Sequence, residues 1–119
     1  MGTKVEKEMK TNTTEGKILK GYRQYLKLEK ALSANTIEAY LNDLSKLVRF
    51  LKDNEIPLLE AQLEHLESFS ASLHDIGIHP RSQARILSGI RSFYHFLVME
   101  NYLQADPSEL LESPNIGFH

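Results

Sequence analysis

Arginine, serine and histidine side chains recur along residues 79–99 at spacings that suit one face of a helix. At 100° per residue, one narrow stripe contains Arg81, Arg85, Ser88, Ser92 and His95, with Arg91 at its edge, and none of the intervening residues is Asp or Glu. Arginine forks and hydroxyls suit phosphate oxygens and base edges, whereas a solvated helix face usually mixes both signs of charge. The pattern therefore predicts contact with an anionic partner, although an ordinary amphipathic helix with a basic outer face gives the same pattern. The candidate binding residues are Arg81, Ser82, Arg85, Ser88, Arg91 and His95.

Two of these candidates, and two of their neighbours, have competing interpretations. Ser82 lies off the stripe, and its candidacy rests on its place at the start of the helix. Arg85 has a structural alternative, an ion pair with Asp43 or another acid. Phe96 lies off the apolar arc and is expected to pack against another helix. Gly89 is explained either by close approach of another backbone or by neutral drift.

A second polar group lies where another helix is expected to begin. Ser33, Asn35 and Thr36 precede the most regular helical period in the sequence, and free N–H groups at a helix start attract phosphate. Capping of the helix is the competing role, and it does not exclude a contact. Lys46, opposite the apolar side of the same helix, is either a phosphate contact or an ordinary solvated lysine. Tyr40 falls inside the apolar arc, which favours a place in the core.

No catalytic or metal-binding constellation is expected in this sequence. The five histidines show no i, i+4 pair, and the chain has no cysteine, so we expect no metal, no disulfide and no cofactor. Glycine-rich phosphate loops and nucleophile elbows are absent from the sequence. No apolar run is long enough to span a membrane.

The elements that must position these side chains are all predicted to be helices. Apolar residues recur with a helical period, and sustained alternation of apolar and polar residues, typical of strands, is missing. This pattern predicts an all-α bundle of four to five helices. The expected ranges are Thr14–Lys30, Ser33–Asn54, Glu60–His74 and Pro80–Asn101, with a short fifth helix after Asp106. A left-handed residue is expected at Asn54, and Gly77 and Asn101 are expected to end the helices that precede them. Residues 1–13 are predicted to be a disordered tail, residues 14–114 one domain, and residues 115–119 the start of a linker.

Charge is segregated along the chain although its net value is only −2. Residues 1–52 carry 11 basic and 6 acidic side chains, and residues 79–99 carry 3 basic and none acidic. Residues 53–78 and 100–119 contain no Lys or Arg and carry 6 and 4 acids. A basic face therefore remains compatible with nucleic-acid binding, because the local field matters more than the total charge.

Two motifs resemble the N-terminal, core-binding domain of Xer-type tyrosine recombinases and phage integrases, with the XerD-like branch as the nearest likeness. The first is LSANTIEAYLNDLSKLVRFL, which is similar to the second-helix signature of that domain. The second is RSQARILSGIRSFYHFLVMENYLQADPSELLESP, which is similar to its last long helix and exit, with Gly89 where the family pattern has alanine. The similarity covers residues 16–114.

The resemblance implies a SAM-like bundle whose second and fourth helices approach the major groove, forming half of a clamp on a recombination half-site. It also implies double-stranded DNA and other recombinase protomers as partners, with no membrane and no small-molecule ligand. Catalysis would belong to a separate C-terminal domain, so these 119 residues alone are expected to be monomeric, inactive, and part of a cytoplasmic, nucleoid-associated bacterial protein. The alternative is a helical protein-interaction bundle, since a fold does not fix a function; the acid-free arginine face favours DNA over that alternative.

Overall fold

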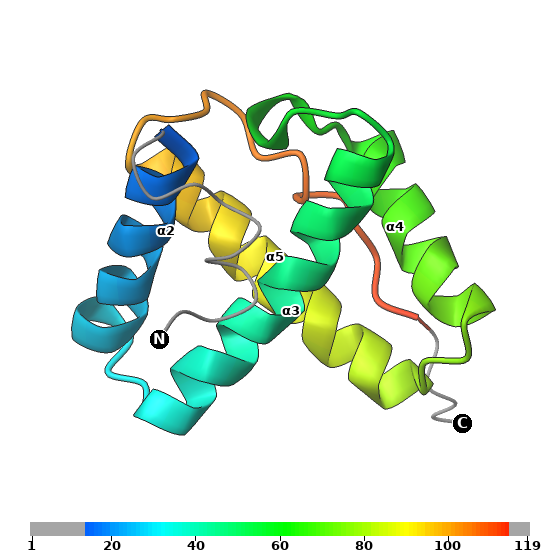
Figure 1. Ribbon diagram of the computed structural model, residues 1–119, viewed down its shortest axis with the longest axis horizontal. Coiled ribbons are helices and arrows are strands. Elements are labelled where there is room, and N and C mark those ends of the chain that lie inside the picture. Colours follow the sequence, from blue (N-terminus) through cyan, green and yellow to red (C-terminus); the bar gives the residue numbers. More distant parts are fainter. Residues whose placement is uncertain (1–13, 115–119) are drawn as a thin grey trace. The chain divides into compact units, whose positions relative to one another are not determined.

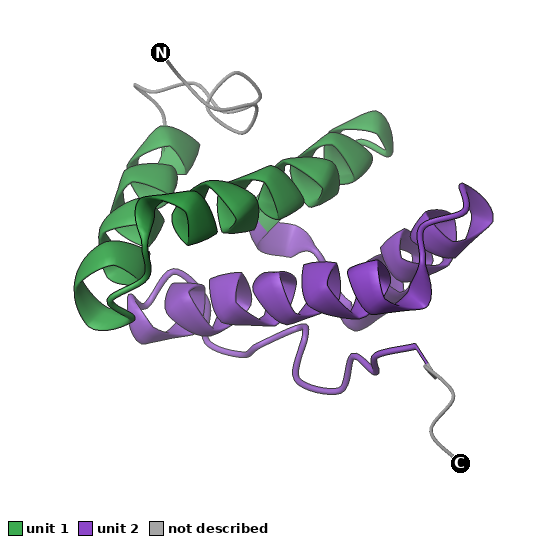
Figure 2. Cartoon of the chain, turned by 90° about the horizontal axis from the view of Figure 1, so that it is seen from below, with its two compact units in different colours: residues 1–58 green, residues 59–119 purple. Residues whose placement is uncertain are grey.

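The computed structural model describes residues 14–114, all of whose regular elements are helical (Figure 1). They are α2 (Thr14–Gln24), the π-helical turn η1 (Tyr25–Glu29), α3 (Ala34–Asp53), the 3-10 turn η2 (Leu58–Glu60), α4 (Leu63–Asp75) and α5 (Pro80–Met99). The all-α prediction is confirmed. The tail and linker predicted for residues 1–13 and 115–119 lie outside the described residues. The chain divides after Leu58 into two compact units (Figure 2), which are taken one at a time.

In the first unit, α2 and α3 form an open V joined at residues 30–33 (Figure 2). The predicted first helix continues to Glu29, but its last turn widens into a π-helix. The Leu32 N–H donates to the Leu26 carbonyl at 3.0 Å, and Ala31 takes a positive φ of 53°. This is the left-handed helix stop usually made with glycine. The apolar side of α2 and η1 is buried at Ile18, Leu19, Tyr22, Tyr25 and Leu26.

The long helix α3 begins and ends by local hydrogen bonds. The Ser33 Oγ accepts the Thr36 N–H at 3.2 Å, which confirms the predicted cap. The prediction of a left-handed residue at Asn54 is wrong. Asn54 still belongs to the last turn, and its N–H bonds to the Phe50 and Leu51 carbonyls. The reversal comes one residue later, at Glu55, with φ 58°. The side chains of Ile37, Leu41, Leu44, Leu47, Val48 and Leu51 are buried.

In the second unit, α4 and α5 pack against each other. The helix predicted from Glu60 starts at Leu63, because residues 58–60 form a separate 3-10 turn after Pro57. Gly77 ends α4 with φ 87°, as predicted, and α5 opens with Pro80 at its first position. Gln83 ties the two helices together: its Nε2 donates to the Ser70 carbonyl and Oγ at 2.9 and 2.8 Å.

The segment after α5, residues 100–114, runs back along that helix (Figure 1). Asn101, which was predicted to end this helix, takes a positive φ of 63° just after it. The prediction of a short fifth helix is wrong, because residues 107–110 form turns with i to i+3 bonds only. The Asp106 Oδ1 accepts from the Ser108 N–H and Oγ at 2.8 and 2.6 Å, and Ser108 and Leu111 are buried. The Asp106 bonds and the burial of these two side chains anchor the segment.

Gly89 sits in the middle of α5, where a Cβ would meet no heavy atom within 4 Å. The close backbone approach considered for this residue is therefore not found. We expect Gly89→Ala to raise the free energy of unfolding by about 0.5–1 kcal/mol, because alanine loses less backbone entropy in a helix. Gly77→Ala is the matched control and should lower the free energy of unfolding, since φ 87° strains any residue other than glycine. Urea unfolding measures both, and destabilisation by Gly89→Ala would contradict the open space at that position.

Candidate nucleic-acid interface

Burial divides α5 into two faces. The apolar face is buried at Ile86, Leu87, Ile90, Phe93, Tyr94, Phe96 and Leu97. The opposite face exposes Arg81, Arg85, Ser88 and His95, which we call the basic stripe. Four turns of helix place the ends of the stripe about 21 Å apart. Because the buried face fixes the rotation of the helix about its axis, these four side chains stand out together on one surface.

The start of α5 is partly satisfied by its own chain. The His79 Nδ1 accepts the Arg81 N–H at 3.1 Å, which removes one of the free donors that a phosphate would use. Ser82 is half-buried. Its candidacy as a DNA contact is therefore weaker than that of the neighbouring Arg81, which is exposed.

Arg91 lies at the edge of the stripe and holds residues 100–114, which we call the exit segment. Its Nε and Nη2 donate to the Leu111 carbonyl at 3.2 and 2.6 Å, and Nη2 also donates to the Ser113 Oγ at 3.2 Å. The side chain is half-buried. Sequence periodicity missed this role because the partners lie 20 and 22 residues away. Because its guanidinium group is bonded to a carbonyl, Arg91 is less available for bases or phosphates than the exposed Arg81.

The candidates of the first unit lie on α3. Ser33, besides capping the helix, is 2.9 Å from the Thr36 Oγ1 through its own Oγ. Asn35 is exposed beside them in the first turn. Lys46 is exposed, and its Nζ lies 3.7 Å from the Oδ1 of the buried Asp43. The separation of 3.7 Å is long for an ion pair and Lys46 itself is exposed, so the Lys46 charge remains available to an approaching anion. The proposed pairing of Arg85 with Asp43 stays a hypothesis.

The tyrosines of the described region belong mostly to the interior. Tyr22, Tyr25 and Tyr94 are buried, and Tyr40 is half-buried. Burial, with the negative charge of Asp106 as a second cause, raises the pKa of Tyr94 far above its usual value. The Tyr94 hydroxyl therefore stays protonated. Between residues 14 and 114, no three His, Asp or Glu side chains are grouped as metal ligands would be, and no helix is long and apolar enough to cross a bilayer.

Residues 19–101 match the family model of the phage integrase N-terminal SAM-like domain. The chain belongs to this family. The match confirms the resemblance carried by the two sequence motifs, and it includes all ten candidate DNA-binding residues.

Curated relatives of this integrase-type domain are tyrosine recombinases. The chain is 39% identical over 98 residues to tyrosine recombinase XerD of Staphylococcus saprophyticus, covering 82% of this chain and 33% of that protein. It is 36% identical over 101 residues to XerD of Chlorobaculum tepidum, covering 85% and 33%. It is 38% identical over 97 residues to XerC of Pseudomonas savastanoi, covering 81% and 32%. The chain thus spans about a third of the length of these relatives. A comparison with solved structures found no significant match.

The hold of Arg91 on the exit segment can be tested without DNA. We expect Arg91→Ala to lower the free energy of unfolding by about 1–3 kcal/mol, because the Leu111 carbonyl loses a charged donor. Amide exchange at residues 111–113 should speed up more than exchange in α4. Arg81→Ala serves as the control for loss of an exposed arginine on the same helix. Unchanged exchange at residues 111–113 in Arg91→Ala would show that other contacts hold this segment.

Proposed function

We propose that this domain binds double-stranded DNA at a recombination half-site, as the clamping part of a site-specific tyrosine recombinase. The observation that carries the proposal is the basic stripe of α5, which no acid interrupts between Pro80 and Met99. The residues proposed to contact DNA are those predicted from the sequence: Ser33, Asn35, Thr36, Lys46, Arg81, Ser82, Arg85, Ser88, Arg91 and His95. Within this set the geometry favours the exposed Arg81 over Arg91 for direct contact, since Arg91 already holds the exit segment.

The proposed docking places α5 in the major groove and the start of α3 against the phosphate backbone. An α-helix fits the major groove, where arginine recognises the O6 and N7 atoms of guanine. Hydroxyls and N–H groups at a helix start suit phosphates. The acidic side chains of α4, Glu64 and Glu67, are exposed and would repel phosphates, so α4 should face away from the duplex.

The activity of a whole recombinase requires more than these residues. The curated relatives are named tyrosine recombinases and are about three times as long as this chain. We infer that cleavage and joining of DNA strands belong to a catalytic domain outside residues 1–119, that the protein acts with further recombinase protomers, and that it works on bacterial DNA in the cytoplasm. The isolated domain would then bind DNA weakly and cleave none.

Salt titration of duplex binding tests the proposal. If about 3–5 cations meet phosphates, log K should fall with log salt at a slope of roughly −3 to −5. Arg85→Ala should cost about 1–3 kcal/mol and relax the preference at one base position. Lys46→Ala should weaken every sequence alike and make the slope shallower by about one. Fluorescence anisotropy against a half-site and a scrambled duplex measures all three effects.

Matched variants separate DNA contact from folding. Ser33→Asp keeps a capping oxygen but adds negative charge, whereas Ser33→Ala removes the cap. Only Ser33→Asp should lower the free energy of DNA binding by more than it lowers the free energy of unfolding. Glu64→Ala should leave binding unchanged or slightly stronger. If Arg81→Ala and Arg85→Ala both fold and both bind DNA like the parent, α5 does not read DNA, and the protein-interaction alternative replaces this proposal.

A further inference from the structure

One polar side chain anchors the start of α5. Among residues 80–85 only Gln83 is buried, with 4% of its surface exposed, whereas Arg81 is exposed. The buried apolar side chains of this helix begin further along, at Ile86. The first turns of α5, which carry the Arg81 end of the basic stripe, are therefore held by a side-chain amide and not by a buried apolar side chain.

The Gln83 amide donates two hydrogen bonds to one residue of α4. Its Nε2 lies 2.9 Å from the Ser70 carbonyl oxygen and 2.8 Å from the Ser70 Oγ. A hydrogen bond weakens steeply when its donor and acceptor are misaligned, whereas apolar contact has no preferred direction. The two bonds therefore fix both the rotation of the start of α5 and its position along α4.

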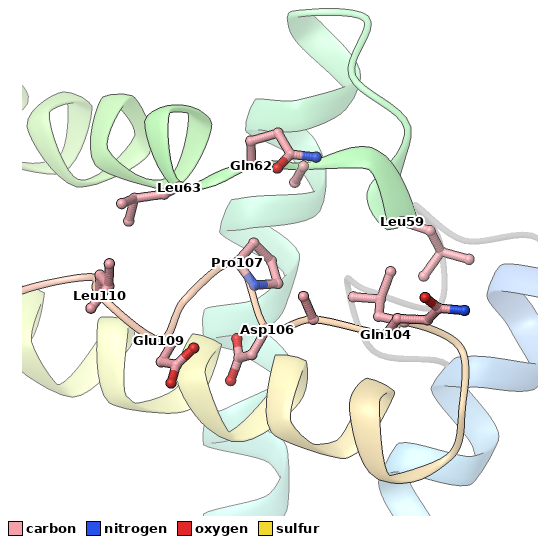
Figure 3. Close-up of a pocket in the computed structure, with 11 residues that line it drawn as sticks. Leu59, Gln62, Leu63, Gln104, Asp106, Pro107, Glu109 and Leu110 are labelled. Carbon is pink, nitrogen blue, oxygen red and sulfur yellow. The ribbon is translucent and has the colours of Figure 1, made fainter.

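The apolar packing of α4 does not specify this position by itself. Three side chains of the helix are buried: Leu66, Phe69 and Leu73. At the start of α4, Leu63 lines a pocket of about 370 Å³ that lies between this helix and the exit segment (Figure 3). Because the packing is open at that end, it offers little resistance to a small shift of α4. The two bonds between Gln83 and Ser70 resist such a shift directly.

We propose that Gln83 is a positioning residue for base reading, because it fixes where the Arg81 guanidinium group lies when α5 enters the major groove. A bidentate contact between arginine and guanine requires two N–H groups to align with O6 and N7, so a small displacement of the helix start breaks it. Contacts between cations and phosphates tolerate such a displacement, since they depend mainly on charge. Gln83 therefore controls sequence preference more than affinity.

This inference rests on the proposed binding of DNA by α5, and it adds a residue that touches no DNA. Its test begins with a duplex that the parent chain selects from a randomised DNA library. Fluorescence anisotropy then gives the preference of each variant for this duplex over a scrambled duplex of the same composition. Urea unfolding of each variant shows whether the chain still folds cooperatively.

Gln83→Met keeps the length and the helix propensity of the side chain but removes the amide. We expect it to lower the sequence preference about tenfold, which is the discrimination supplied by one arginine–base contact. Affinity for the scrambled duplex should stay within about twofold of the parent value, because the phosphate contacts remain. Gln104→Met is the matched control, since Gln104 is an exposed glutamine at the pocket (Figure 3), and it should change neither quantity.

Two further variants separate positioning from stability. Ser70→Ala removes one of the two acceptors, so it should lower the preference by less than Gln83→Met does, and it decides the question if Gln83→Met does not fold. In an Arg81→Ala background, Gln83→Met should cause no further loss, because the contact that it positions is already absent.

A folded Gln83→Met chain with the full preference of the parent would overturn this inference while leaving the proposed function intact. An undiminished further loss in the Arg81→Ala background would also overturn it, since Gln83 would then act without Arg81. A parent chain that selects no duplex would contradict the proposed function, and this inference with it.

Discussion

The two faces of α5 constrain the rest of the functional surface. One face carries large apolar side chains that are completely or almost completely buried, including Ile90, Phe93 and Leu97. Turning the helix to hide the arginines would expose these side chains, at about 25 cal/mol for each Å² of apolar surface. The core therefore holds the basic stripe in a fixed direction.

Charge segregation supports the same arrangement. The chain is close to neutral overall, yet the helix that we propose to enter the groove has no acid, and α4 with the exit segment has no lysine or arginine. The basic surface suits DNA. Arg91 connects these regions, since it extends from the edge of the stripe to the carbonyl of Leu111.

Much of the fold could be predicted because its signals are local. Each of these signals depends on a few neighbouring residues: the Ser33 cap, the helix ends at Gly77 and Asn101, and Pro80 at the start of α5. The fifth helix was wrong for the opposite reason. Asp106, Pro107 and Ser108 form a good local start signal, but only i to i+3 bonds follow it and the segment forms turns. The Asn54 error was a shift of one residue, which local patterns do not resolve.

The candidate site could be predicted only as far as a helix face determines it. Periodicity placed Arg81, Arg85, Ser88 and His95 on one exposed face, as the structure shows. It could not show that Arg91 bonds to the exit segment, that Lys46 lies near Asp43, or that a pocket forms between α4 and residues 103–110. These features join residues that are distant in sequence or differ in side-chain reach, so they require coordinates.

Nuclear magnetic resonance titration of the labelled domain with a half-site duplex tests the central claim most directly. The account predicts that the largest salt-dependent shifts occur at Arg81, Arg85, Ser88 and His95 and at residues 33–36. The side of α4 that carries Glu64 and Glu67 should remain unperturbed, because phosphates are repelled there. Shifts centred on α4 with an unperturbed α5 would contradict the assignment of α5 as the DNA-binding helix.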